Sequence, residues 1–154
     1  MESALDEIEF LALSQNRVDA LRYLAERPHS RRELVERTGA SQPTMGRILS
    51  DFEDRSWLVR EDGAYRATVT GELVSRGFDD LVDILDTDAK LRPVVEWLPT
   101  DAITFDLEHL TEATITTPSQ VRPNAPVKRA VSLLSEAEDV RIFSYAFNEQ
   151  NLDI

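Results

Sequence analysis

The sequence contains no cysteine, and this absence excludes several kinds of chemistry at once. A chain without cysteine forms no disulfide, binds no metal through thiolates and has no cysteine nucleophile. Long apolar runs are also missing, since no stretch approaches the roughly 18 residues that a membrane span requires. The N-terminus, MESALDEIEF, is acidic and lacks the basic region and small-residue cleavage site of a secretory signal. We therefore expect a cytoplasmic protein with no membrane segment.

Lysine is scarce, because Lys90 and Lys128 are the only lysines among 17 basic residues, whereas Asp and Glu together number 29. The resulting net charge is -12. A surface that keeps arginine, avoids lysine and accumulates carboxylates is expected at very high salt, where screening weakens repulsion between like charges. The alternative is an acidic protein from a GC-rich genome. We expect a halophilic archaeal origin.

The arginines gather in one segment of this acidic chain. Residues 27–50 hold five of them against two glutamates, a net charge of +3, so the remainder carries -15. These five are Arg27, Arg31, Arg32, Arg37 and Arg47. Because the release of counterions from phosphates supplies most of the non-specific affinity for nucleic acids, this segment is where a DNA contact is expected.

Helical spacing and capping residues predict three helices in the first third of the chain. Residues 4–26 have apolar positions at helical spacing, with a possible break at 14–16. Ser30 with Glu33 three residues later forms a capping box that begins a short helix at 31–37, and Gly39 ends it. A third helix follows Ser41, which acts as its cap, and runs to about residue 55 with apolar positions at Met45, Leu49 and Phe52.

A β-hairpin is predicted after the third helix. The runs 57–60 and 64–68 are rich in strand-forming residues, and Asp62-Gly63 between them is a strong signal for a two-residue turn. Two helices, a capped third helix and a hairpin form the order of a winged helix-turn-helix. This order predicts that residues 1–70 are a DNA-binding domain whose third helix enters the major groove.

The pattern of residues 71–154 predicts that a helical linker and the start of a small α/β regulatory domain follow the winged helix. The whole chain is therefore expected to be an α+β protein. Helical spacing resumes at Thr70, with a possible break at 86–88, and a further helix from Leu91 to Leu98 ends at Pro99. We interpret residues 71–99 as a linker that forms a homodimer through its surplus of apolar side chains. In residues 100–154, strands at 114–117 and 140–147 and a helix at 127–138 are expected to form the beginning of that regulatory domain.

With these motifs in view, the chain resembles the archaeal, haloarchaeal-type winged helix-turn-helix transcriptional regulators that carry a C-terminal regulatory domain. The resemblance covers nearly the whole chain, and its most specific parts are the third helix and the wing. The matching segments are 10–17, 41–49, 65–71, 96–99 and 127–130. Such proteins run well past residue 154, so we expect this chain to be an N-terminal fragment or a short form. The resemblance implies a DNA-binding regulator, with an effector that it does not identify.

The candidate DNA-binding residues lie on the second and third helices and on the wing. Arg47 is expected on the exposed face of the third helix, where arginine reads guanine; pairing with Asp51 or Glu53 is the alternative. Gln42 and Thr44 are candidate base readers, and Ser41 and Pro43 form the first turn, where Ser41 is primarily a cap. Phosphate contacts are expected from two arginines at the start of the second helix and two beside the wing tip; for each, plain solvation is the alternative. These four are Arg31, Arg32, Arg60 and Arg66.

Catalytic and metal-binding signals are weak. His29 and His109 have no second ligand at metal spacing, and the aspartates between 79 and 88 suit a solvated helix face. Trp57 and Trp97 are interpreted as core or interface anchors. We therefore expect no enzyme, no cofactor and no metal. A winged helix that docks on another protein remains the alternative function, although residues 41–50 carry one arginine and no acid, which favours DNA.

Overall fold

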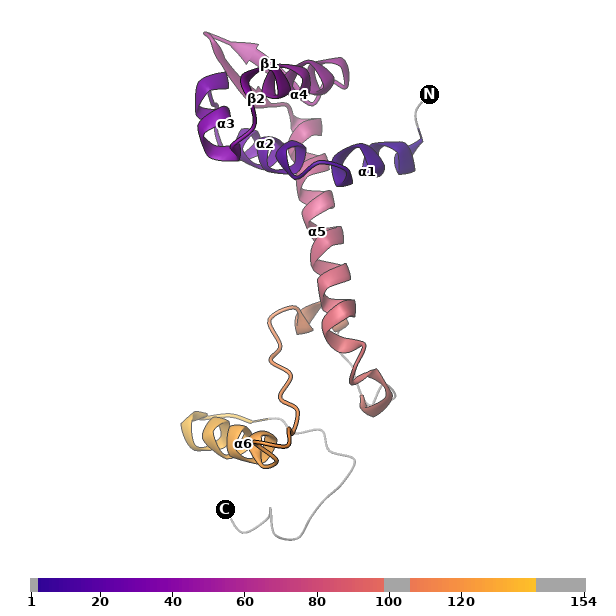
Figure 1. The fold of residues 1–154 in the computed structure, drawn as a ribbon, viewed down its shortest axis with the longest axis vertical. Coiled ribbons are helices and arrows are strands. Elements are labelled where there is room, and N and C mark those ends of the chain that lie inside the picture. Colours follow the sequence, from indigo (N-terminus) through magenta and orange to yellow (C-terminus); the bar gives the residue numbers. More distant parts are fainter. Residues whose placement is uncertain (1–2, 99–105, 141–154) are drawn as a thin grey trace. The chain divides into compact units, whose positions relative to one another are not determined.

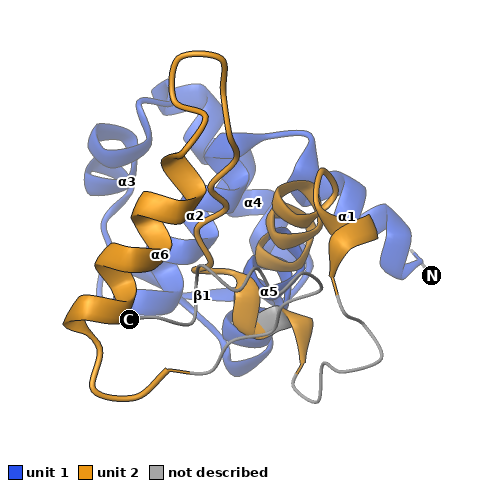
Figure 2. Cartoon of the chain, turned by 90° about the horizontal axis from the view of Figure 1, so that it is seen from below, with its two compact units in different colours: residues 1–82 blue, residues 83–154 orange. Residues whose placement is uncertain are grey.

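The computed structural model describes residues 3–98 and 106–140 of the chain (Figure 1). These residues belong to two compact units, Met1–Val82 and Asp83–Ile154, which Figure 2 colours separately. Within the described residues, helices dominate and one antiparallel pair of strands forms the sheet. The α+β class predicted from the sequence is therefore confirmed.

Two helices open the first unit. Helix α1 spans Ala4–Ala12 and helix α2 spans Gln15–Glu26, so the helical run breaks where the sequence indicated. At the start of α1, the Ser3 hydroxyl accepts the Asp6 N–H at 3.2 Å, and the Asp6 carboxylate accepts the Ser3 N–H at 2.7 Å. These bonds hold the pKa of Asp6 below its usual range and satisfy backbone donors that a helix leaves free.

The helix-turn-helix follows, with α3 at Arg31–Thr38 and α4 at Gln42–Asp54. The predicted capping box is present, because the Glu33 carboxylate accepts the Ser30 N–H at 2.7 Å and the Ser30 hydroxyl accepts the Glu33 N–H at 3.3 Å. Gly39 ends α3 in the left-handed region, at φ 71°. A side chain is strained in that conformation, so glycine makes the sharp corner between the two helices possible.

The wing is a hairpin of β1, Leu58–Glu61, and β2, Ala64–Ala67, paired antiparallel with Leu58 opposite Ala67. Asp62 and Gly63 both have positive φ, 51° and 82°, as a type I′ turn requires. The backbones of His29 and Tyr65 exchange two hydrogen bonds of 2.8 Å. This bridge attaches the wing to the segment between α2 and α3.

The core of the first unit contains side chains from helices α1, α2, α3 and α4 and from the wing. Phe52 is fully buried, and its ring lies 6.2 Å from that of Phe10 and 5.8 Å from that of Trp57, centroid to centroid. The other buried apolar residues are Leu11, Val18, Ala20, Leu21, Leu24, Leu34, Ala40, Met45, Ile48, Leu49, Leu58 and Ala67. The predicted apolar stripe of the third helix and the predicted burial of Trp57 are confirmed.

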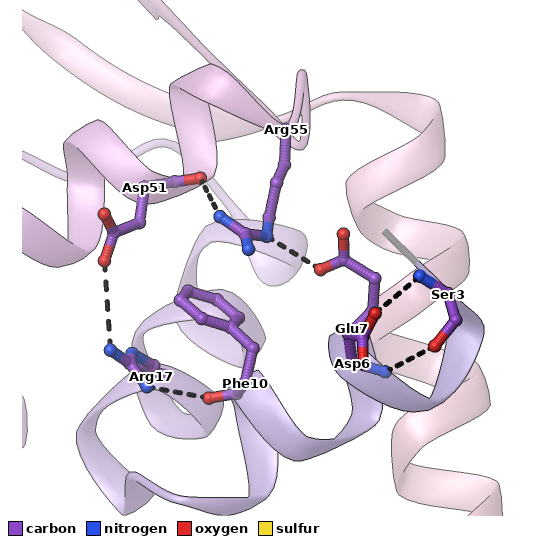
Figure 3. A network of polar contacts seen from close by, with 7 residues as sticks. All are labelled: Ser3, Asp6, Glu7, Phe10, Arg17, Asp51 and Arg55. Carbon is purple, nitrogen blue, oxygen red and sulfur yellow. Dashed lines mark hydrogen bonds and ion pairs between the residues drawn. The ribbon is translucent and has the colours of Figure 1, made fainter. Parts of the chain in front are cut away.

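A polar network at the edge of this core fixes α4 against α1 and α2. Figure 3 shows the ring of Phe10 between the guanidinium groups of Arg17 and Arg55, which lie 4.1 and 3.9 Å from its centroid. Arg55 donates to the Glu7 carboxylate at 2.7 Å, and Arg17 lies 3.9 Å from the Asp51 carboxylate. Because the Glu7–Arg55 pair is largely screened from solvent, it holds the end of α4 more firmly than an exposed pair would.

Helix α5, Val69–Leu91, starts against the turn that precedes the wing. The Thr68 hydroxyl accepts the Gly71 N–H at 3.1 Å, as an N-cap does, and donates to the Ser56 carbonyl at 2.7 Å. The helix runs without a break through 86–88, so the predicted interruption there is wrong. Thr87 turns inward and is buried, whereas Asp86 and Asp88 face solvent, which suits one continuous helix.

In the second unit, the end of α5 is tied to the segment after the 3₁₀ helix Leu107–Leu110. The Thr87 hydroxyl donates to the Thr111 hydroxyl at 3.0 Å, and the Lys90 ammonium donates to the Thr111 carbonyl. The predicted helix from Leu91 to Leu98 is wrong: α5 ends at Leu91, and a 3₁₀ turn, Val95–Trp97, follows. Pro93 explains the end, because proline has no N–H and disfavours helical backbone in the residue before it.

Of the elements predicted for residues 100–154, the described structure contains the helix but not the first strand. Helix α6, Ala125–Glu136, confirms the helix expected at 127–138. The strand predicted at 114–117 is wrong, since this segment is irregular and has no neighbouring strand within the described residues. A strand depends on a partner for its backbone hydrogen bonds, which β-branched composition does not supply. Most of the strand predicted at 140–147 lies outside the described residues. Trp97 is 68% exposed, so it is no core anchor here.

Candidate nucleic-acid interface

Helix α4 buries one face and exposes the other. Met45, Ile48, Leu49 and Phe52 are buried in the core. The exposed face of α4 carries Gln42, Thr44, Arg47 and Ser50, all open to solvent as the sequence predicted. These side chains are short or planar, so another macromolecule could approach this face of the helix closely.

Arg47 is the one charged residue between 41 and 50. Within the described residues its guanidinium makes no hydrogen bond or ion pair. The two carboxylates that competed for it in the sequence do not hold it, because Asp51 faces Arg17 at 3.9 Å and Glu53 forms no described pair with Arg47. Arg47 is therefore a cation held on a rigid helix and directed into solvent.

The first turn of α4 is organised by Ser41. Its hydroxyl accepts the Thr44 N–H at 3.2 Å and lies 2.8 Å from the Thr44 hydroxyl. Pro43 occupies the first turn, where its missing N–H leaves no bond unmade. The predicted cap is confirmed, and the Thr44 side chain is oriented by it. Gln42 stays exposed, while its carbonyl accepts a bond from Arg31.

The two arginines at the start of α3 behave differently. Arg31 reaches across the corner of the helix-turn-helix and donates from Nη2 to the carbonyl of Gln42, the first residue of α4. Arg32 stays on its own helix and pairs with Glu36 at 2.9 Å, with its side chain 84% exposed. That hydrogen bond raises the pKa of Arg32, so the group stays charged, but the carboxylate beside it offsets the charge. Only Arg31 joins the surface of α4.

The wing arginines are also occupied. The Arg60 guanidinium lies over the Tyr65 ring, 5.4 Å from its centroid. Arg66 donates to the Glu61 carboxylate from Nε at 3.2 Å and from Nη2 at 3.3 Å, which lowers the pKa of Glu61. Both residues are exposed on the hairpin, as predicted. The structure thus places the nine candidate residues on α3, the first turns of α4 and the wing, with Arg47 the least engaged of the cations.

Sequence reasoning missed the role of Gly46. A Cβ built on this residue would lie 2.6 Å from Nη2 and 3.0 Å from Cζ of Arg31. The bare α-carbon therefore leaves the space that the Arg31 side chain fills. The sequence contained one signal for it, a glycine in the middle of a strongly capped helix, but nothing that linked position 46 to position 31.

The described residues also show whether metal-ligating side chains gather anywhere. The described residues hold no cluster of three His, Asp or Glu side chains that would ligate a metal ion. His29 is 1% exposed, and its backbone forms the bridge to Tyr65. Among the described helices, none combines the length and the apolar composition that a bilayer span requires.

A capped helix-turn-helix followed by a two-stranded wing defines the first unit as a winged-helix domain, as predicted. Residues 5–90 match the family described as the HVO_A0261 N-terminal domain, and because this match covers more than half of the chain, the protein belongs to that family. No curated protein matches the sequence significantly.

Three solved structures are similar at low identity. The MarR family protein Rv2887 of Mycobacterium tuberculosis is 18% identical, with a TM-score of 0.49 over 84% of this chain and 79% of that one. Ligand-free NadR is 19% identical, with a TM-score of 0.47 over 71% and 90%. MepR, a transcription regulator of the Staphylococcus aureus multidrug efflux pump MepA, is 14% identical, with a TM-score of 0.49 over 84% and 85%. Similarity this low identifies neither a target nor a ligand.

Proposed function

We propose that this protein is a transcriptional regulator that binds double-stranded DNA sequence-specifically, with α4 in the major groove and the wing on the phosphate backbone. The observation that carries the proposal is the exposed, unpaired side chain of Arg47 in the described chain. It is an exposed arginine without a carboxylate partner in the described chain, on the face of a capped helix whose residues 41–50 include no acid. A guanidinium in this position suits bidentate recognition of guanine O6 and N7.

The neighbouring residues support the same assignment. Gln42 and Thr44 present polar side chains at the N-terminal end of α4, the end from which helix-turn-helix proteins contact base edges. Ser41 and Pro43 keep that end compact. In this proposal Arg32 and Arg66 exchange their exposed glutamate partners for DNA phosphates. Arg60, which lies over the Tyr65 ring, also contacts a phosphate. The exchange costs little, because solvent screens exposed ion pairs and they contribute little to stability.

The acidity of the rest of the chain shapes how this binding depends on salt. Outside 27–50 the chain carries -15, and this charge repels DNA at a distance. Screening reduces the range of such repulsion from about 10 Å at 0.1 M salt to about 3 Å at 1 M. We therefore propose that the protein works in a high-salt cytoplasm, where contact residues act while the long-range repulsion is suppressed.

The test is a binding titration on the DNA upstream of the protein's own gene, followed by fluorescence anisotropy at several salt concentrations. Arg47→Ala is expected to weaken binding by about 1–3 kcal/mol and to relax base preference at one position. Arg129→Ala is the matched control, because it removes the same charge from an exposed position on α6. Unchanged affinity and base preference for Arg47→Ala contradict the proposed role of this residue. Absence of binding at every salt concentration favours the alternative of a protein-docking winged helix.

We also propose that residues 71–99 form a homodimer interface and that residues 100–154 belong to a regulatory domain for an unidentified effector. Helix α5 supports the first part, since it exposes Leu73, Ile84 and Leu85 by 59%, 44% and 57%. Paired copies match the paired half-sites that helix-turn-helix proteins read. Sedimentation at working salt should show a species of twice 17.5 kDa. A 17.5 kDa species alone counts against the dimer.

A further inference from the structure

Gly46 and Arg31 meet at the corner between α3 and α4, although they are 15 positions apart in the sequence. The Arg31 guanidinium donates to the Gln42 carbonyl and fills the space where a side chain on residue 46 would be, 2.6 Å from a Cβ built there. Gly46 is not a C-cap and its φ is not positive, so the backbone does not require glycine. Glycine is among the least favourable residues inside a helix. Its use here is explained by the guanidinium that lies against it.

The charge of Arg31 has no carboxylate partner within residues 3–98 and 106–140, the part that the structure describes. The chain has 29 acidic residues, and Arg32, next in sequence, pairs with Glu36. Arg31 makes no ion pair within the described residues; its described bond goes to the Gln42 carbonyl. A guanidinium has five N–H donors in a fixed plane, so a single carbonyl leaves most of them available to a ligand. Arg31 is exposed beside the exposed face of α4, in a fixed position.

We propose that Gly46 is a positioning residue: its bare α-carbon seats the Arg31 guanidinium on α4, where it contacts one DNA backbone phosphate. This inference rests on the proposed function and adds to it how a cation supplied by α3 is oriented at the surface of α4. A guanidinium held in place binds a phosphate with less loss of side-chain entropy than one free in solvent. A residue at 46 that is larger than glycine displaces Arg31, while the fold stays intact because only the end of a flexible side chain must move.

The experiment compares wild type, Gly46→Ala, Arg31→Ala and the double variant on the DNA upstream of the gene. Each single variant is expected to weaken binding about tenfold, as loss of a charge-assisted hydrogen bond does. The double variant should bind no more weakly than Arg31→Ala. The slope of log affinity against log salt should fall by about 0.9 in all three variants, which corresponds to one phosphate contact. If Arg31 only stabilised the packing of α3 against α4, that slope would stay unchanged.

Two further readouts keep the outcomes apart. Thermal unfolding of Gly46→Ala should occur at or above the wild-type temperature, so weaker binding cannot be ascribed to unfolding. The NMR signal of the Arg31 Nε–H should move in Gly46→Ala without DNA, because the guanidinium leaves its seat. Wild-type affinity in Gly46→Ala overturns the inference, as does an additive loss in the double variant, which would mean that the added methyl group itself obstructs DNA. If the wild-type protein binds no DNA but Gly46→Ala still shifts the Arg31 signal, the proposed function and the phosphate contact are both wrong. The packing of Arg31 against Gly46 is then still supported.

Discussion

The substitution Gly71→Ala is expected to destabilise the first unit, although alanine favours helices and position 71 lies in the first turn of α5. Gly71 is buried against the backbone of Trp57. A Cβ built on it would lie 2.9 Å from the carbonyl carbon and 3.2 Å from the α-carbon of Trp57, and closer still to the carbonyl oxygen. Because these are backbone atoms, they cannot rotate away as the end of a side chain can.

The size of the effect follows from what must move. The Trp57 carbonyl accepts the Thr68 N–H at 2.9 Å, and Thr68 in turn caps Gly71 at 3.1 Å, so relief of the clash disturbs bonds worth about 1 kcal/mol each. Overpacking at a rigid site costs about 1–3 kcal/mol, whereas the exchange of glycine for alanine in a helix returns at most about 1 kcal/mol. We expect the free energy of unfolding to fall by about 2–3 kcal/mol.

The control is Gly77→Ala on the same helix, because a Cβ at position 77 meets nothing within 4 Å. This variant should raise the free energy of unfolding by about 0.5–1 kcal/mol, so the two glycine substitutions have opposite signs. Urea unfolding followed by circular dichroism and tryptophan fluorescence measures both. If Gly71→Ala is as stable as Gly77→Ala, the packing of α5 against Trp57 described above is wrong.

Three other perturbations test the fold independently. Burial of His29, with the charges of Arg27 and Arg37, lowers its pKa. The unfolded chain therefore takes up a proton near pH 6.5 before the folded chain does, and the free energy of unfolding should fall as the pH drops below about 6.5. His29→Phe should flatten that dependence below about pH 6.5 in urea titrations; equal slopes would argue against it. Phe52→Ala should cost about 3–5 kcal/mol in the same assay, because the ring is fully buried between two aromatic neighbours. Asp79→Ala, which removes a half-exposed partner of Arg22, should cost less than about 1 kcal/mol, and a larger loss would show that this pair between α2 and α5 is stronger than its exposure indicates.

Elements that depend on neighbours in sequence were predicted well. The capping box of Ser30 and Glu33, the left-handed Gly39 and the Asp62-Gly63 turn each join residues at most four positions apart, so the sequence contains both partners of every bond. The stripe of Met45, Leu49 and Phe52 was equally legible, because its helical spacing needs only an apolar core to face. The early end of α5 is predictable too, because Pro93 lies two residues after Leu91 in the sequence.

Elements that depend on distant partners were not predictable in the same way. Residues 114–117 have the β-branched composition of a strand, yet a strand forms only where another strand supplies hydrogen bonds, and the described chain has none beside them. The exposure of the candidate DNA-binding residues followed from helical periodicity, but their engagement did not. The pairing of Arg66 with Glu61 and the position of Arg60 over Tyr65 arise across the hairpin.

The sequence by itself determined that this chain forms a winged helix and that Arg47 faces away from its core, because periodicity, caps and turn residues act within a few positions. Only the tertiary structure decided which arginines remain available. Arg31, Arg32 and Arg47 look alike in the sequence, but one fills the space above Gly46, one pairs with a glutamate and one extends into solvent. The pair of Arg32 with Glu36 is local to α3. The position of Arg31 on α4 instead depends on which helix surfaces meet at the corner after Gly39, and the geometry of that meeting is a property of the packed core.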